Sequence, residues 1–448
     1  MEIFRELHEG LVVRSAEPQD TAALVDLQIH AFANPDTNEP DIYLGGWTRD
    51  LMGGKHPIFK PQDFLVVEDT KTRALVSCVC WLSQTWSMDG VAFGVGRPEI
   101  VCTDAAYRKR GLVREQFQVL HEWSRQRGEL VQAITGIPFF YRQFGYEYAI
   151  DLPPPRQTFV PQQIPELKAG VQEKFRLRRA REEELTFIAD MYAQGARRSL
   201  LHCERNVEMF RYEQYFECDA LSGNLTWWDI IETTHGERAG ILAHRRYVHQ
   251  GRNTANCFEL LPQFDWDKVA PDVLRVLARE APAYASYDNK PLTKLYWFLE
   301  EQHPFFQVMK ESTAPLFDAY AWYVRVPDLR AFLKHIAPVL EKRLAASAFA
   351  LYTGALRLHF YPHGVEMIFE NGKVSEVHAW HATTNDFGQS GFGNAAFPDL
   401  TFLKLLFGYR NRAELQFIFP DVLTDGDKTN ALLDVLFPKR ATNILPMH

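Results

Sequence analysis

Glu99-Ile-Val-Cys-Thr-Asp-Ala-Ala-Tyr-Arg-Lys-Arg-Gly-Leu-Val113 is the stretch that decides the fold. Its first five residues predict a strand, and the residues after it predict an amphipathic helix with Val113, Phe117 and Leu120 on one face. Residues 108–111 form a basic turn between the two. Because a helix N-terminus offers unpaired N–H groups and the positive end of the helix dipole, this turn suits a pyrophosphate. A solvated basic turn before an ordinary helix is the alternative.

A second motif follows the helix. Gly128 ends the helical pattern, residues 130–134 predict the next strand, and then comes Gly136-Ile-Pro-Phe-Phe-Tyr141-Arg-Gln-Phe-Gly-Tyr146. The order of strand, basic turn, helix, strand and this aromatic segment resembles the GNAT acetyltransferases. With the chain length and a second αβ unit, it resembles the subgroup of the mycobacterial enhanced intracellular survival (Eis-like) acetyltransferases.

Proline residues divide the chain near residue 150. Asp151-Leu-Pro-Pro-Pro155 fixes backbone angles and removes amide donors, so neither a helix nor a central strand runs through it. A second αβ unit then opens at Phe175-Arg-Leu-Arg-Arg179, much as the first opens at Leu11-Val-Val-Arg14. Further along, Asn371-Gly372 lies between two apolar strand patterns and predicts a tight hairpin turn.

The resemblance implies the fold class α/β (α+β), with tandem GNAT-like acetyltransferase domains followed by a sterol-carrier-protein-like α+β domain. The expected domains are an N-terminal GNAT catalytic domain (1–152), a second, cofactor-less GNAT-like domain (153–322) and the C-terminal sterol-carrier-protein-like domain (323–448). In the second unit, Cys257-Phe-Glu-Leu-Leu-Pro-Gln-Phe-Asp-Trp266 lies where the basic loop would be, without a basic residue or a glycine. We therefore expect no coenzyme A (CoA) in that unit.

The resemblance also implies a set of site residues. The cofactor-binding set consists of a strand backbone that pairs with the pantetheine arm and a loop that holds the pyrophosphate: Val101, Cys102, Thr103, Arg108, Lys109, Arg110, Gly111, Leu112 and Val113. Val113 departs from the family pattern, which has Gly or Ala there. Tyr141 matches the tyrosine that protonates the departing CoA thiolate. A phenol with a pKa near 10 that gives a proton to a thiolate with a pKa near 8.5 faces a step uphill by about 2 kcal/mol.

The general base and the acceptor pocket have weaker sequence signals. In the resembling family the C-terminal carboxylate, usually on an aromatic residue, reaches the active site; this chain ends in His448, so the aromatic part of the pattern is absent. That carboxylate is better suited to position the amine, or to relay its proton, than to remove the proton directly. The candidate acceptor residues are Asp36, Glu39, Asp41 and Trp47, which suit a cationic amine. A solvated loop is the alternative for this segment.

Composition narrows the partners and the location. A net charge of −8 argues against a nucleic-acid partner. The longest apolar run, residues 74–82, is about half the length of a membrane-spanning helix, and residues 1–10 do not look like a secretory signal, so we expect a cytoplasmic protein without a membrane partner. None of the six cysteines is in CxxC spacing, and no histidine cluster has the ligand spacing of a metal site. We expect no metal.

The family resemblance implies an acetyl-CoA-dependent N-acetyltransferase, an acyltransferase of the EC 2.3.1 type. Acetyl-CoA is the co-substrate, and the acceptor is a small-molecule or peptide primary amine: an aminoglycoside, a polyamine or a lysine-type group. The expected mechanism is direct attack in a ternary complex, and the family resemblance implies a homo-oligomer. The alternative is a non-catalytic acyl-CoA- or lipid-binding protein that uses the C-terminal domain.

Overall fold

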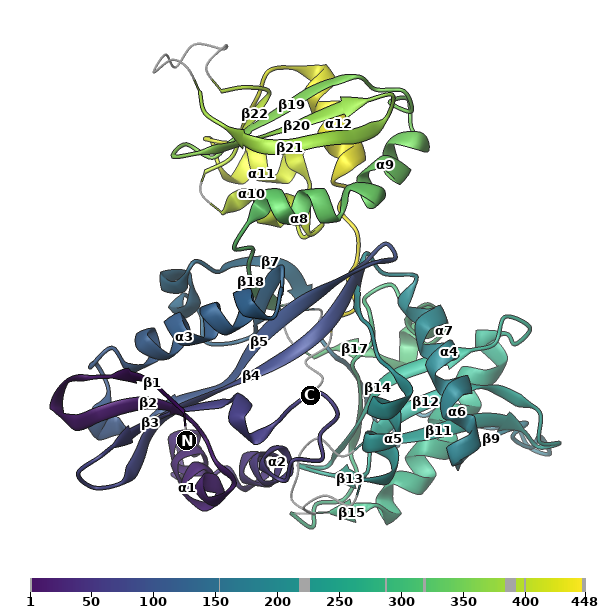
Figure 1. Ribbon diagram of the computed structural model, residues 1–448. Coiled ribbons are helices and arrows are strands. Elements are labelled where there is room, and N and C mark those ends of the chain that lie inside the picture. The colour runs from purple at the N-terminus through teal and green to yellow at the C-terminus, as the bar shows by residue number, and fades with distance from the viewer. Residues whose placement is uncertain are drawn as a thin grey trace.

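The computed structural model describes residues 2–152, 154–216, 226–286, 288–316, 320–382, 392–398 and 400–444. The chain folds into three lobes, with the first and second units side by side and the C-terminal lobe packed against them from one side (Figure 1). Each lobe is built around a sheet of its own. The N-terminal sheet is the largest, and it carries the motifs quoted above.

The first unit is a twisted sheet with helices on both faces. Its strand order is β1 (Ile3–Glu6), β2 (Leu11–Ser15), β3 (Phe64–Asp69), β4 (Ala74–Met88), β5 (Val91–Thr103), β6 (Val131–Ile134), β18 (Tyr320–Arg325) and β7 (Glu147–Leu152). Helix α3 (Leu112–Gln126) covers one face, and α1 (Thr21–Ala31) and α2 (Ile42–Met52) cover the other (Figure 1). The predicted strand, basic turn and helix thus correspond to β5, the turn and α3.

The two central strands of this sheet separate after a short parallel contact. Strands β5 and β6 pair only at Val95 with Val131 and at Gly96 with Gln132. Beyond that point β5 continues to Thr103, and its pairing with β4 shifts by one residue at a bulge. Ile100 at the bulge has a φ of +52°, which a β-branched residue rarely adopts. The bulge and the separation open a wedge at the centre of the sheet.

The second unit repeats this architecture. Its strand order is β9 (Phe175–Arg179), β11 (Thr226–Thr233), β12 (Arg238–Arg245), β14 (Arg252–Leu260), β16 (Lys294–Trp297), β8 (Arg156–Phe159) and β17 (Ala314–Pro315). The helices are α4 (Leu185–Ala196), α5 (Val207–Tyr215), α6 (Trp266–Glu280) and α7 (Pro304–Val308). Three short strands lie outside this order: β10 (Leu201–Cys203) pairs with β4, and β13 (Tyr247–Val248) pairs with β15 (Ala285–Ser286). As in the first unit, a parallel pair (β14 and β16) lies next to an antiparallel partner.

An ion-pair network repeats at the same place in both units. In the first, Arg14 donates to Asp20 at 2.7 Å and to Glu68 at 2.6 Å. In the second, Arg178 makes the equivalent bonds to two glutamates, at 2.6 and 2.7 Å. Each arginine lies on the first strand of the repeated order, and each network ties that strand to the next strand and to the following helix start. This atomic correspondence supports a duplicated, diverged αβ unit.

The two units exchange strands. After β7 the chain enters the second sheet as β8, and after β17 it returns to the first sheet as β18, between β6 and β7. The expected boundary at residue 322 therefore falls inside a strand of the first sheet. The division into three domains stays a prediction, but the first sheet includes residues 320–325 as well as residues of the N-terminal part.

The C-terminal lobe is an α+β layer. Its strands are β19 (Gly354–His359), β20 (Gly364–Glu370), β21 (Lys373–Trp380), β22 (Ala395–Ala396) and β23 (Leu423–Thr424). Its helices are α8 (Leu329–His335), α9 (Ala337–Ala345), α10 (Thr401–Leu406), α11 (Arg412–Ile418) and α12 (Asp427–Leu436). The predicted hairpin at Asn371-Gly372 is confirmed, with φ values of +50° and +78° between β20 and β21. The mixed α/β class with GNAT-like sheets is also confirmed, while the likeness of this lobe to a sterol carrier protein stays a prediction.

Candidate active site

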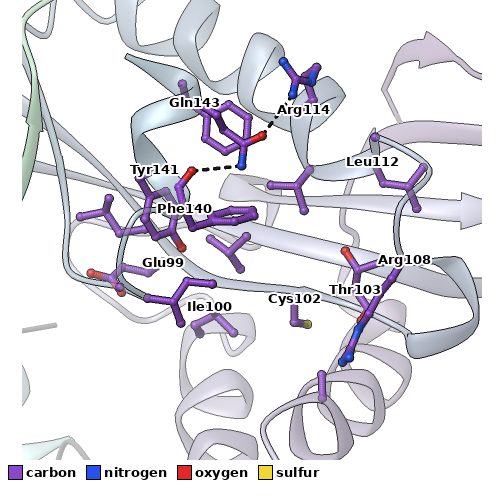
Figure 2. A pocket seen from close by; sticks show the side chains of 18 of the residues that line it. Glu99, Ile100, Cys102, Thr103, Arg108, Leu112, Arg114, Phe140, Tyr141 and Gln143 are labelled. Atoms are coloured by element: carbon purple, nitrogen blue, oxygen red, sulfur yellow. Dashed lines mark hydrogen bonds between the residues drawn. The ribbon is translucent and has the colours of Figure 1, made fainter. Parts of the chain in front are cut away.

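A cavity of about 780 Å³ opens where β5 and β6 separate. Figure 2 places Glu99 and Tyr141 at one end of it and Thr103 and Arg108 at the other. The cavity is lined by the end of α1, β5, the basic turn, the start of α3, the end of β6 and the segment after it: Ala31, Phe32, Glu99, Ile100, Val101, Cys102, Thr103, Tyr107, Arg108, Lys109, Arg110, Gly111, Leu112, Val113, Arg114, Ile134, Thr135, Gly136, Ile137, Phe140, Tyr141, Gln143 and Phe144. All nine predicted cofactor-binding residues and Tyr141 are in this set.

Strand β5 meets the cavity mainly through its backbone. The Cys102 thiol points to the other face of the sheet, 3.4 Å from the Cys78 sulfur, and burial and this contact raise its pKa. The hydroxyl of Thr103 is held by Ser77 at 2.9 Å. Since β6 has moved away, the edge of β5 after the bulge offers main-chain donors and acceptors to a ligand with amide groups.

The basic turn has a backbone conformation that suits an anion. Lys109 and Gly111 both have positive φ values, +62° and +78°, which alternate with residues in ordinary conformations. Such alternation turns successive N–H groups toward one point. A Cβ built on Gly111 meets nothing within 4 Å, so the glycine serves the backbone angle rather than a lack of space. Helix α3 follows directly and adds the N–H groups of its first turn.

The two arginines of the turn have different surroundings. Arg108 donates to the Thr103 carbonyl at 3.3 Å, and Arg110 forms an ion pair with Glu9 at 2.8 Å. Arg110 is thus directed toward the N-terminal segment in addition to lining the cavity. A further cation, Arg114, lines the cavity from α3 and donates to Gln143 at 3.1 Å. Our sequence reasoning missed Arg114, although it directly follows Val113, the last residue of the quoted stretch.

Tyr141 lies at the opposite end of the cavity, in a 3₁₀ turn (Phe140–Phe144). Its side chain is buried, and the ring lies directly against Gly136, because a Cβ at that position would come within 2.3 Å of the ring. Burial, and then the charge of Glu99, raise the pKa of the Tyr141 hydroxyl well above that of a free phenol. Tyr141 is therefore fully protonated at neutral pH.

Glu99 is a site residue that the sequence reasoning missed. Its side chain is 13% exposed and forms an ion pair with the fully buried Arg97. Burial raises the pKa of the Glu99 carboxyl, and the Arg97 charge opposes that rise. The available signal was its position at the start of the quoted strand, two residues after Arg97 and hence on the same face.

The predicted acceptor residues lie outside the cavity lining described above. Asp36 and Glu39 are exposed, Asp41 caps α2 by accepting from the Leu44 amide at 3.1 Å, and Trp47 packs beside the core between the helices and the sheet. His448, whose carboxylate is the predicted base, lies outside the described residues.

The second unit has a similar wedge, where β14 continues beyond its pairing with β16, and polar side chains bond beside it. His303 donates from Nε2 to the Phe258 carbonyl on β14 at 2.8 Å, the strand equivalent to β5. Beside it, Arg198 bonds to Glu259 at 2.5 Å and to Glu300 at 2.8 Å. The lack of CoA in the second unit stays a prediction.

Among the described residues, no group of three or more His, Cys, Asp or Glu side chains is placed to hold a metal ion. None of the helices in the described ranges is both long and apolar enough to cross a membrane.

Comparison with known proteins gives one family match and several structural relatives. Residues 12–149 match the acetyltransferase (GNAT) domain family, and no curated protein matches the chain. A probable N-acyltransferase from Enterococcus faecalis is 13% identical, with a TM-score of 0.65, and the match covers 98% of this chain and 100% of that one. A GCN5-related N-acetyltransferase from Kribbella flavida is 16% identical, with a TM-score of 0.62 and 98% of each chain covered. Eis1 from Mycobacterium abscessus is 11% identical, with a TM-score of 0.56, over 95% of this chain and 96% of that one. The chain thus carries a GNAT-family acetyltransferase domain at residues 12–149 and shares the fold of these proteins over nearly its whole length.

Proposed function

We propose that the protein transfers the acetyl group of acetyl-CoA to a primary amine by direct attack in a ternary complex. The observation that carries the proposal is one cavity with an anion-binding turn at one end and Tyr141 with Glu99 at the other. The turn would hold the CoA pyrophosphate, and the free edge of β5 would pair with the pantetheine amides. This arrangement would bring the thioester to the end of the cavity where the two titratable groups lie.

The proposed reaction needs one proton removed and one supplied. A neutral amine nitrogen attacks the acetyl carbonyl carbon, the carbon–sulfur bond breaks, and the sulfur leaves as a thiolate. Tyr141 gives its proton to the thiolate, and a base takes the proton that the nitrogen loses. The products are the N-acetylated amine and the CoA thiol. The base then returns a proton to Tyr141 through solvent. The proton donor can be a weak acid, because the thiolate forms in the same buried site.

Glu99 is our first candidate for the base. Its carboxylate lies at the Tyr141 end of the cavity, and its raised pKa makes it a better proton acceptor than an exposed glutamate. The His448 carboxylate is the second candidate, as proposed from the family resemblance. A variant that ends at residue 444 distinguishes the two candidate bases. An unchanged kcat would exclude the His448 carboxylate and support Glu99, whereas loss of turnover with CoA binding intact would support His448.

The experiment that tests the function measures CoA-thiol release from acetyl-CoA with polyamines, aminoglycosides and lysine peptides. We expect turnover with at least one of these amines, and a loss of kcat of about 10² to 10⁴ in Tyr141→Phe. The same variant should bind CoA as the unchanged protein does in calorimetry, because the hydroxyl is remote from the phosphate turn. CoA binding without turnover of any of these amines would contradict the proposed acetyltransferase function and favour an acyl-CoA-binding protein.

A further inference from the structure

Two hydrogen-bonded tyrosine hydroxyls connect strands β7 and β18 to Gly136, in the segment that leads to Tyr141. Tyr148 on β7 and Tyr320 on β18 have their hydroxyl oxygens 3.0 Å apart, and the Tyr320 hydroxyl donates to the Gly136 carbonyl. A phenol has one proton to donate. Because Tyr320 donates its proton to the Gly136 carbonyl, Tyr148 is the donor in the bond between the two tyrosines. The result is a directed series from β7 through β18 to the segment that follows β6.

Gly136 links this series to Tyr141. A Cβ at Gly136 would lie 2.3 Å from Cε2 of Tyr141, so the backbone at this residue is the surface against which the ring rests. A change of a few tenths of an ångström in the position of Gly136 therefore moves the ring or opens space beneath it. The Gly136 carbonyl is the group that Tyr320 holds.

A second contact from β18 restrains the same ring. Tyr323 lies with its ring centroid 5.6 Å from that of Tyr141 in an edge-on arrangement, and it stacks on Tyr148 at 3.9 Å. Among the described residues that line the cavity, none of these three tyrosines is included. They can act on the reaction only through the groups they contact.

We propose that Tyr320 is a positioning residue that fixes Gly136 and so sets the Tyr141 hydroxyl for proton transfer. The inference rests on the proposed function of Tyr141. Tyr320 belongs to the strand that returns from the second unit, so the catalytic turn of the first unit depends on a residue that lies 184 positions further along the chain.

A double-mutant cycle tests this proposal. Tyr320→Phe keeps the ring and removes the bond to Gly136, and it should lower kcat about five- to tenfold with the KM for acetyl-CoA unchanged. In a Tyr141→Phe background the same change should cost about twofold at most, because the group that Tyr320 positions is gone. An unchanged kcat for Tyr320→Phe, or an equal loss in both backgrounds, would overturn the inference.

Two further variants serve as controls for the double-mutant cycle. Tyr148→Phe removes only the donor to Tyr320, so it should give a smaller loss that also vanishes in the Tyr141→Phe background. Tyr352→Phe is the matched control, since its hydroxyl donates to the Ala355 carbonyl at 3.4 Å in the C-terminal lobe, and it should leave kcat unchanged. If Tyr141→Phe alone loses no activity, the proposed function fails; if only Tyr320→Phe is silent, the inference alone fails.

Discussion

Tyr141 and Glu99 both have a pKa above the ordinary value of their side chain. Burial raises the pKa of both groups, and the negative charge of Glu99 raises that of Tyr141 further. Arg97 limits the effect on Glu99, because its guanidinium favours the charged carboxylate. The pair is therefore set so that Tyr141 keeps its proton while Glu99 can lose and regain one. Two groups of this kind in one cavity are suited to proton transfers on opposite sides of the same reaction.

The raised pKa of Glu99 predicts how activity depends on pH. A base must be ionised to accept a proton, so kcat/KM should increase with pH through a pKa above the ordinary 4.5 of a glutamate. Glu99→Gln should abolish this increase of kcat/KM with pH and lower kcat by about 10² to 10³. The measurement is a pH–rate profile of both proteins, with Glu122→Gln, an exposed position on α3, as control. An identical profile in Glu99→Gln would exclude Glu99 as the base.

His121 predicts a pH dependence of stability. Its ring lies 3.2 Å from the Tyr146 hydroxyl, and burial together with the Arg325 charge lowers its pKa from 6.5 to about 3. Between these two values the unfolded chain binds a proton that the folded protein does not, so stability falls as pH decreases below 6.5 and is fully present above it. The Tm should drop over this range by less in His121→Gln than in the unchanged protein. Parallel slopes for the two proteins would contradict the assignment.

At the scale of the element, the basic turn combines a backbone shape with a helix end. Lys109 and Gly111 supply the two positive φ angles, and α3 supplies the dipole and its free amides. The Tyr107 hydroxyl donates to Asp69 at 2.8 Å, which ties the turn to the neighbouring strand β3. In the proposed phosphate site, the main chain would therefore supply most of the contacts, and the cations of the turn would add to them.

Two glycines provide a matched test of this turn. Gly111 and Gly128 have positive φ values of +78° and +70°, and a Cβ on either meets nothing within 4 Å. Alanine at each position should lower the free energy of unfolding by about 1 kcal/mol. Only Gly111→Ala should also weaken CoA binding, because Gly128 ends the helix far from the turn. Equal Kd values for CoA in calorimetry would contradict an anion site at residues 108–113.

The local motifs could be predicted from the sequence, and the long-range contacts could not. The strand, the turn and the helix follow from periodicity and turn chemistry within a short stretch of sequence, and Tyr141 follows from the family resemblance. For the ion pair of Glu99 with Arg97, the sequence indicated only that the two residues lie on the same face of a strand. The place of β18 between β6 and β7 depends on sheet pairing across the whole second unit, for which the sequence of β18 carries no local signal.

At the scale of the whole molecule, the lobes are joined by more than linkers. Trp322 on β18 is fully buried in a core that continues from the first sheet into the C-terminal lobe, where Phe93 meets Phe332 at 5.1 Å. Lys404 of the C-terminal lobe bonds at 2.9 Å to Glu147, which also bonds to Arg142, the residue next to Tyr141. The site in the first unit is thus supported by both other parts of the chain.

Strand exchange predicts that the first unit does not fold alone. A chain of residues 1–152 lacks β18, which leaves β6 and β7 without the strand that joins them. We expect this fragment to show no near-ultraviolet circular dichroism and no CoA binding, whereas a chain ending at residue 444 should retain both. Native CoA affinity in the short fragment would contradict the structural role of the exchanged strand.

The most direct measurement of the central claim is a crystal structure of the protein with CoA. The account predicts one CoA per chain, with the pyrophosphate on the amides of residues 109–113, the pantetheine along Val101 and Thr103, and the sulfur within hydrogen-bond reach of the Tyr141 hydroxyl. The wedge of the second unit should contain His303 and no ligand. CoA bound in the second unit or in the C-terminal lobe, or a sulfur directed away from Tyr141, would contradict the account.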